Sequence, residues 1–120
     1  MNGSNEVVQL LIEKGADVNS KNNDNMTPLH YAISNRKYEV AQHLVKKGAD
    51  VNAKNNDNMT PLHYVAWYSA QTGHYEVVQL LVEKGANVNA KTNYNMTPLH
   101  LTARNGKFEL VKHLVEIGAD

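Results

Sequence analysis

The sequence of 120 residues predicts an all-α repeat protein, a solenoid of stacked antiparallel helix pairs with projecting hairpin-like loops. Two recurring markers lead to this prediction. The hexapeptide NMTPLH occurs three times, at intervals of 33 and 37 residues, beginning at Asn25, Asn58 and Asn95. The heptapeptide EKGADVN or a near copy alternates with it, beginning at Glu13, Lys46 and Glu83. One unit therefore repeats along the whole chain.

The first helix of each unit is predicted from its start signal. A threonine stands where a helix N-cap is expected, and a proline follows at the first helical position, where its missing N–H costs nothing. These pairs are Thr27 with Pro28, Thr60 with Pro61, and Thr97 with Pro98. Leu62, Val65 and Ala66 then share one face at helical spacing. Gly73 and Gly106 stand where this helix is expected to end.

The second helix of the unit is predicted from a run such as YEVVQLLVEKG. Its apolar residues recur at helical spacing, and we expect four of them to face inward: Val77, Val78, Leu81 and Val82. Gly85 is then expected to end the helix in a left-handed conformation. The next residues alternate like a strand into a turn, which predicts a hairpin-like loop before the next unit.

Together with the 33-residue period, the segments TPLHYA (27–32) and GADVNA (48–53) make the sequence resemble the ankyrin repeat family. The resemblance covers essentially the whole chain as one domain, 1–120. It implies a second half of a repeat in 1–21, a repeat in 22–54, a longer repeat in 55–91, and a last repeat in 92–120 that stops after its second helix. It further implies an L-shaped, right-handed stack whose concave face, formed by hairpin tips and first helices, binds other proteins.

Several residues depart from the family pattern. Asparagine replaces the usual glycine of the hairpin turn, and it is the non-glycine residue that best tolerates a positive φ, at Asn25, Asn58 and Asn95. Arg36 replaces the glycine that ends the first helix, so a left-handed conformation there costs about 1–2 kcal/mol. Val65 and Thr102 replace a small alanine, and we expect them to loosen or shift the local packing.

The composition and the lack of catalytic motifs argue against enzymatic activity. Acidic and basic residues balance at 12 each, which predicts neither a nucleic-acid nor a membrane partner. Cysteine is absent, which fits a reducing, intracellular compartment and removes thiolate sites. The sequence contains no nucleophile motif, phosphate loop or membrane-spanning run, and its opening residues resemble no signal peptide. We therefore expect no enzyme, no cofactor and no metal.

Histidines recur at one position of the repeat, His30, His63 and His100. Stacked repeats separate such positions by about 8–10 Å, which is too far for one zinc ion. Each imidazole is instead expected to hydrogen-bond the backbone of its own loop and of the neighbouring repeat. His43 and His113 share a helix position with Leu80, so we expect them to be half buried.

The candidate partner-binding residues lie on the expected concave face. Methionine recurs there as Met26, Met59 and Met96, which can reflect either adaptable contact or mere duplication of the unit. Tyr94 replaces an aspartate at a hairpin tip, where an aromatic side chain is a better candidate for contact. The remaining candidates are Trp67, Tyr68, Gln71 and Arg104.

The segment from Tyr64 to Val77 is four residues longer than its counterpart from Tyr31 to Val40. Four residues is close to one helical turn, so the first helix can lengthen without rotating its core face. Ser69, Ala70 and Gly73 would then face inward, while Trp67 and Tyr68 would project from the repeats. A bulged loop, or aromatics folded back as a small satellite core, are the alternatives.

Protein recognition is the function that these features predict. The alternative is a structural spacer, or a self-assembling segment of a larger ankyrin array. The first unit begins at its second helix and the last helix is as apolar as the internal copies, which favours an excised segment of a longer array. Otherwise the open ends pair with another copy, giving a monomer or a weak homo-oligomer. The asparagine and lysine bias fits an AT-rich genome, such as that of an intracellular microbe whose ankyrin proteins act in a host cell.

Overall fold

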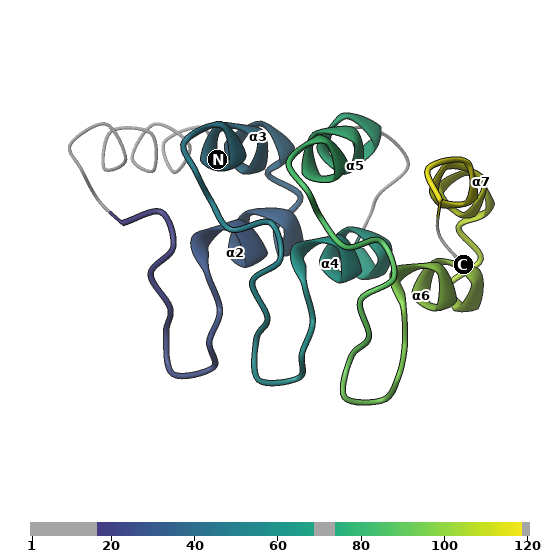
Figure 1. Cartoon of the computed structure of the whole chain (residues 1–120), viewed down its shortest axis with the longest axis horizontal. Helices are drawn as coiled ribbons and strands as arrows, with labels where there is room; N and C mark the ends of the chain where they lie inside the picture. The colour runs from purple at the N-terminus through teal and green to yellow at the C-terminus, as the bar shows by residue number, and fades with distance from the viewer. Residues whose placement is uncertain (1–16, 69–73, 119–120) are drawn as a thin grey trace.

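The computed structural model describes residues 17–68 and 74–118, which form six helices and no strands. Figure 1 shows the helix pairs side by side, with the loops projecting from one edge of the molecule. The first helices of the pairs form the row next to the loops: α2 (Pro28–Ser34), α4 (Pro61–Tyr68) and α6 (Pro98–Arg104). The second helices form the other row: α3 (Tyr38–Lys46), α5 (His74–Glu83) and α7 (Phe108–Glu116). The predicted all-α repeat architecture is confirmed.

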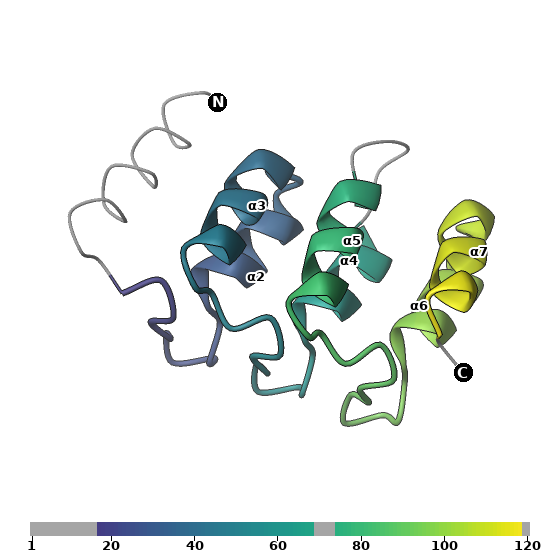
Figure 2. The same ribbon diagram turned by 45° about the horizontal axis from the view of Figure 1, so that its top comes forward.

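The helices pack both within and between pairs. Within each pair α2 packs on α3, α4 on α5 and α6 on α7, while α4 also packs on both α2 and α6, and α3 on α5. The described part of the chain measures 39 × 28 × 23 Å, so it is elongated along the stack (Figure 2). A one-dimensional stack buries a thin core, which agrees with the modest hydrophobic content of 42%.

Each first helix begins at a threonine cap, in agreement with the sequence. Thr27 Oγ1 accepts a hydrogen bond from the backbone N–H of His30, and the imidazole of His30 accepts one from the N–H of Thr27. The same reciprocal pair joins Thr97 with His100 and Thr60 with His63. This is a capping box in which histidine takes the place of the usual glutamate or glutamine.

The core lies between the two rows of helices. Leu62, Val65 and Ala66 of α4 are each at most 1% exposed, as their spacing predicts. Ala103 of α6 is exposed, although it corresponds to Ala66, because α6 has a neighbouring first helix on one side only within the described part of the chain. Thr102, at the usual alanine position, is fully buried, and its hydroxyl donates to the carbonyl of Leu99 at 2.9 Å.

The second helix of the longer repeat also has the predicted inner face. Val77, Val78 and Leu81 are each at most 1% exposed, and Val82 is half buried. Gly85 follows the helix at φ 95°, a left-handed conformation that favours glycine. The predicted helix stop is therefore confirmed.

In the described part of the chain, four non-glycine residues have a left-handed backbone, at the positions where the resemblance to ankyrin repeats leads us to expect glycine. Asn25, Asn58 and Asn95 have φ of 60°, 59° and 60°, and Arg36 has φ of 58°. The Arg36 backbone N–H donates to Ile33 at 2.9 Å, so this conformation closes the end of α2. Its Nε also donates to the carbonyl of Tyr68 in the next repeat at 3.0 Å. Arg36 thus has a strained backbone conformation, and its side chain forms a hydrogen bond between two repeats.

The loops are closed by hydrogen bonds and contain no regular strand within the described residues. In the first loop the N–H of Asn22 donates to Met26 and that of Asn25 donates to Asn22, and the two later loops repeat this pattern. The strand-like alternation of the sequence thus leads into a tight turn, in agreement with the predicted hairpin-like loop. Of the inserted region, Ser69, Ala70, Gln71 and Gly73 lie outside the described residues, as does most of the half repeat expected in 1–21.

Asparagine side chains join successive loops. Asn25 Nδ2 donates to Asn56 Oδ1 at 2.8 Å, and Asn58 Nδ2 donates to Asn93 Oδ1 at 2.6 Å. The backbone N–H of Asn56 also donates to the carbonyl of Asp24 at 3.0 Å. The abundant asparagines therefore form a ladder between repeats as well as turns within them.

Candidate functional site

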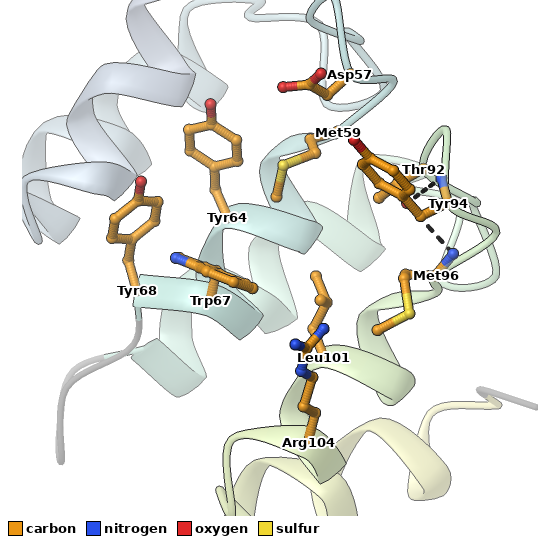
Figure 3. A pocket seen from close by; sticks show the side chains of 10 residues that line it. All are labelled: Asp57, Met59, Tyr64, Trp67, Tyr68, Thr92, Tyr94, Met96, Leu101 and Arg104. Atoms are coloured by element: carbon orange, nitrogen blue, oxygen red, sulfur yellow. Dashed lines mark hydrogen bonds between the residues drawn. The ribbon is translucent and has the colours of Figure 1, made fainter.

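The candidate site is a groove of about 540 Å³ between the second and third described repeats (Figure 3). It is bounded by α4, α6 and the two loops that precede them. Six of the eight candidate binding residues line it: Met59, Trp67, Tyr68, Tyr94, Met96 and Arg104. The other lining residues are Asp57, Tyr64, Thr92 and Leu101. We call this site the α4–α6 groove.

The aromatic residues of the longer repeat have different environments. Trp67 is 45% exposed, whereas Tyr68 is half buried and packs against the core. The Tyr68 ring lies 5.5 Å from that of Tyr64, one helical turn earlier, at 52° between ring planes. Trp67 therefore projects from the repeats, as predicted. Tyr68 instead packs back on its neighbours, which was the alternative.

Tyr64 forms a fixed wall of the groove. Its Oη accepts a hydrogen bond from Asn55 Nδ2 at 2.9 Å and donates to the sulfur of Met26 at 3.0 Å. Its ring meets His30 edge-on at 5.0 Å, and burial raises the pKa of its hydroxyl. Met26 is therefore engaged within the stack and, unlike the two later methionines, does not line the groove.

The opposite wall carries Tyr94, which is 81% exposed at the tip of its loop. The loop backbone beneath it is held by the hydroxyl of Thr92, which accepts from the N–H groups of Tyr94 and Met96 at 3.1 and 3.3 Å (Figure 3). Asn93 ties the same loop to the preceding one through its N–H, which donates to the carbonyl of Asp57 at 3.0 Å. The exposed ring thus stands on an ordered backbone.

Buried histidines position the methionines. His30 and His63 are 0% exposed, and their Nε2 atoms lie 3.0 and 2.9 Å from the carbonyls of Met59 and Met96. Because a carbonyl can only accept, Nε2 carries the proton and Nδ1 accepts from the threonine cap. Burial lowers the pKa of both imidazoles, which favours this neutral form. The expected link between neighbouring repeats is present at both histidines.

His100 keeps its own cap but is exposed, with no next-repeat partner among the described residues. His43 and His113 are half buried, as expected. Within the described part of the chain their Nε2 atoms have no hydrogen-bond partner, although the His113 ring meets Tyr75 edge-on at 5.3 Å. No group of three metal-ligating side chains occurs among the described residues.

Charged side chains stand at the two ends of the α4–α6 groove. Figure 3 shows Asp57 at one end and Arg104 at the other, with Trp67 between them. Both residues are exposed, and within residues 17–68 and 74–118 neither carboxylate nor guanidinium has an ion-pair partner. The groove therefore combines an apolar, aromatic middle with an acidic end and a basic end.

A family model described as ankyrin repeats, in three copies, matches residues 1–92 and 54–120. The chain belongs to the ankyrin repeat family. Ankyrin repeats are generally protein–protein interaction modules, and the family is typically non-enzymatic. A comparison with curated proteins gives no significant match. None of the described helices has the length and apolar character needed to cross a membrane.

Sequence reasoning missed four residues of this ankyrin groove: Asp57, Tyr64, Thr92 and Leu101. Asp57 was visible as the loop residue that Tyr94 replaces, and Tyr64 and Leu101 share one position of the repeat. Repeat positions in the sequence do not reveal which two repeats enclose a groove. Gln71, the eighth candidate, lies outside the described residues.

Proposed function

We propose that the chain is a non-enzymatic recognition module that binds another protein through the α4–α6 groove. One observation carries this proposal: residues that break the repeat collect in a single groove. Aligning the three first helices pairs Trp67 with Ser34 and Arg104, and aligning the loop tips pairs Tyr94 with Asp24 and Asp57. Trp67, Tyr94 and Arg104, all irregular, line one site.

The chemistry of these residues supports protein binding. Tryptophan, tyrosine and arginine are enriched in interface hot spots, and methionine adapts to varied partner surfaces. Trp67 is partly exposed, although exposing a large apolar ring to water is unfavourable by about 25 cal/mol per Å² of apolar surface. A partner that covers the ring recovers this free energy.

Preorganisation supports the same proposal. Tyr64 is fixed by two side-chain hydrogen bonds, and the loop below Tyr94 is fixed by Thr92 and Asn93. Binding to such a site orders few protein groups, so less affinity is lost to conformational entropy. The ankyrin repeat family is typically non-enzymatic, which supports a role without catalysis.

The repeat divisions 22–54, 55–91 and 92–120 are proposed as the units of one binding domain. An intracellular location is proposed because a cysteine-free chain suits a reducing compartment. We further propose that the partner is a protein, with neither nucleic acid nor membrane bound by a chain of zero formal net charge.

A spacer or self-assembling segment is the second candidate function. It is favoured by exposed apolar side chains on the last helix pair, Phe108 at 76% and Val115 at 54% exposure. A second copy that covered these residues would give a weak homo-oligomer. Light scattering across a concentration series measures this directly, and a concentration-independent monomer would argue against it.

The proposed function is tested with a random peptide display library selected on three proteins. The wild-type chain and Phe108→Ala should enrich common peptides, and Trp67→Ala should lose them. Phe108 is the matched control because it is an exposed aromatic residue outside the groove. Thermal melts followed by circular dichroism verify that all three proteins fold. Equal enrichment on all three would contradict the α4–α6 groove as the binding site.

A further inference from the structure

We propose that the partner segment in the α4–α6 groove is a short, bipolar peptide. An apolar or aromatic side chain would contact Trp67 and the methionines, a basic residue would face Asp57, and an acidic residue would face Arg104. This inference rests on the proposed function and adds the chemistry of the ligand. It is carried by the charges at the groove ends and by the volume between them.

The volume of the groove limits the size of the ligand. Pockets of about 300–1,000 Å³ accommodate a ligand of drug-like size. At about 540 Å³ the α4–α6 groove therefore holds a few residues of a peptide, and it is too small for a folded element with its own core. An anchor side chain in the groove would meet Met59, Met96 and Leu101, which are the non-aromatic apolar residues of the lining.

The charges select the composition. Asp57 comes from the loop of the second described repeat and Arg104 from the last residue of α6 in the third, so the groove runs along the helices from tip to base (Figure 3). Neither side chain has an ion-pair partner within the described residues. A segment with one basic and one acidic residue complements both ends, whereas a uniformly charged ligand is repelled at one end.

The charges at the two ends of the groove also disfavour two other ligand classes. A nucleic-acid backbone would pair with Arg104 but would bring phosphates to Asp57. A purely cationic segment would suit Asp57 and the faces of Trp67 and Tyr94 but would meet Arg104 at the other end. A bipolar peptide is the class of ligand that meets no like charge at either end of the groove.

The charge pair is specific to this place in the stack. At the preceding junction, alignment of the repeats puts Asp24 at the position of Asp57, but Trp67 at the position of Arg104. The basic end is therefore absent there, although the methionine and histidine positions are retained. This difference predicts that the peptide binds at one junction only, and it supplies a control residue.

The test uses three sets of fluorescently labelled synthetic peptides that share one apolar anchor residue. The anchor is flanked by one Lys and one Glu in the bipolar set, by two Lys in the bibasic set, and by two Glu in the biacidic set. Fluorescence anisotropy gives the affinity of each set for the wild-type chain. We expect the bipolar set to bind about threefold to tenfold more tightly than either other set, because each of the other sets replaces one exposed ion pair by a like-charge contact.

Charge reversals at the ends should change the preferred set in opposite directions. Asp57→Lys makes both ends basic and should favour the biacidic set, whereas Arg104→Glu makes both ends acidic and should favour the bibasic set. Asp24→Lys and Lys112→Glu are matched controls, since they make the same changes at exposed positions outside the groove lining. They should leave the bipolar preference unchanged.

Two results would overturn the inference, and they differ in their meaning for the proposed function. If all three sets bind equally well and Trp67→Ala abolishes binding, the groove recognises an apolar anchor without regard to charge, and the proposed function stands. If binding of every set is unaffected by Trp67→Ala, both the charge assignment and the proposed site are wrong.

Discussion

At the scale of single residues, Arg36 shows how this chain combines local strain with contacts between repeats. Its φ of 58° is a conformation that glycine adopts freely, whereas a side chain there costs about 1–2 kcal/mol. Its Nε donates to the carbonyl of Tyr68, at the end of the helix that carries Trp67. The backbone strain at Arg36 lowers the stability of the fold, and the hydrogen bond to the next repeat, which contributes to the groove, offsets part of this loss.

Arg36→Gly should therefore be more stable than Arg36→Ala, since both variants lose the hydrogen bond to Tyr68 but only glycine relieves the strain of about 1–2 kcal/mol, which exceeds the entropy cost of a glycine. Arg36→Ala keeps the strain and loses the hydrogen bond, so it should destabilise the fold. Urea unfolding of the two variants and the wild type measures both changes. Equal stabilities of Gly and Ala variants would show that the left-handed conformation is not strained.

The buried histidines make stability depend on pH. Burial lowers the pKa of His30 and His63 below the ordinary value of 6.5, so the unfolded chain binds protons more readily than the folded chain. Their stabilising contribution is fully present above pH 6.5 and is lost as pH falls from 6.5 toward the lowered folded pKa. In that range each histidine lowers the free energy of unfolding by at most about 1.4 kcal/mol per pH unit.

The double variant His30→Gln and His63→Gln tests this prediction. Glutamine is a normal partner in a capping box and does not titrate. Urea unfolding between pH 7 and pH 5 should show a clear fall for the wild type and a shallower one for the variant. The same slope in both proteins would mean that other groups control the acid sensitivity.

At the scale of secondary-structure elements, each first helix is defined by a cap that also connects to the next repeat. Thr60 accepts from the N–H of His63, whose Nε2 reaches Met96 in the following loop. The start of α4 and the position of a groove methionine are therefore coupled. A cap mutation should affect both the helix and the neighbouring loop.

Thr60→Ala should destabilise the fold by about 1 kcal/mol, the usual loss for a removed N-cap hydrogen bond. Thr60→Ser is the matched control because it keeps the hydroxyl, and it should stay close to the wild type. Thermal denaturation followed by circular dichroism compares the three proteins. A Ser variant as unstable as the Ala variant would assign the effect to the lost methyl group instead of the cap.

The sequence predicted these elements well because their signals are local. Threonine before proline predicted the helix starts, glycine predicted the left-handed helix stop at Gly85, and asparagine predicted the left-handed residue of each hairpin turn. The unlike environments of Trp67 and Tyr68 were not predictable in this way. They depend on how α4 packs against the neighbouring repeats, which no spacing within one unit encodes.

At the scale of the whole molecule, the fold is a linear stack whose stability passes from neighbour to neighbour. The repeat period predicted this architecture, since one amphipathic pair cannot bury its apolar face alone. The groove was only partly predictable: the irregular residues were evident, but the junction that brings Asp57, Leu101 and Arg104 together depends on three-dimensional stacking. The proposed binding site and the stability of the fold thus depend on the same contacts between repeats.

The stack also predicts that equal core mutations act differently at different places. Leu62 of α4 and Leu114 of α7 are both 1% exposed, and either change to alanine should cost about 2–5 kcal/mol locally. The helix of Leu62 packs on both α2 and α6, whereas α7 packs chiefly on α6. Hydrogen exchange should therefore show loss of protection in all described helices for Leu62→Ala, but mainly in α6 and α7 for Leu114→Ala. Uniform loss of protection in both variants would mean that the 120-residue chain unfolds as a single cooperative unit, with no separable terminal pair.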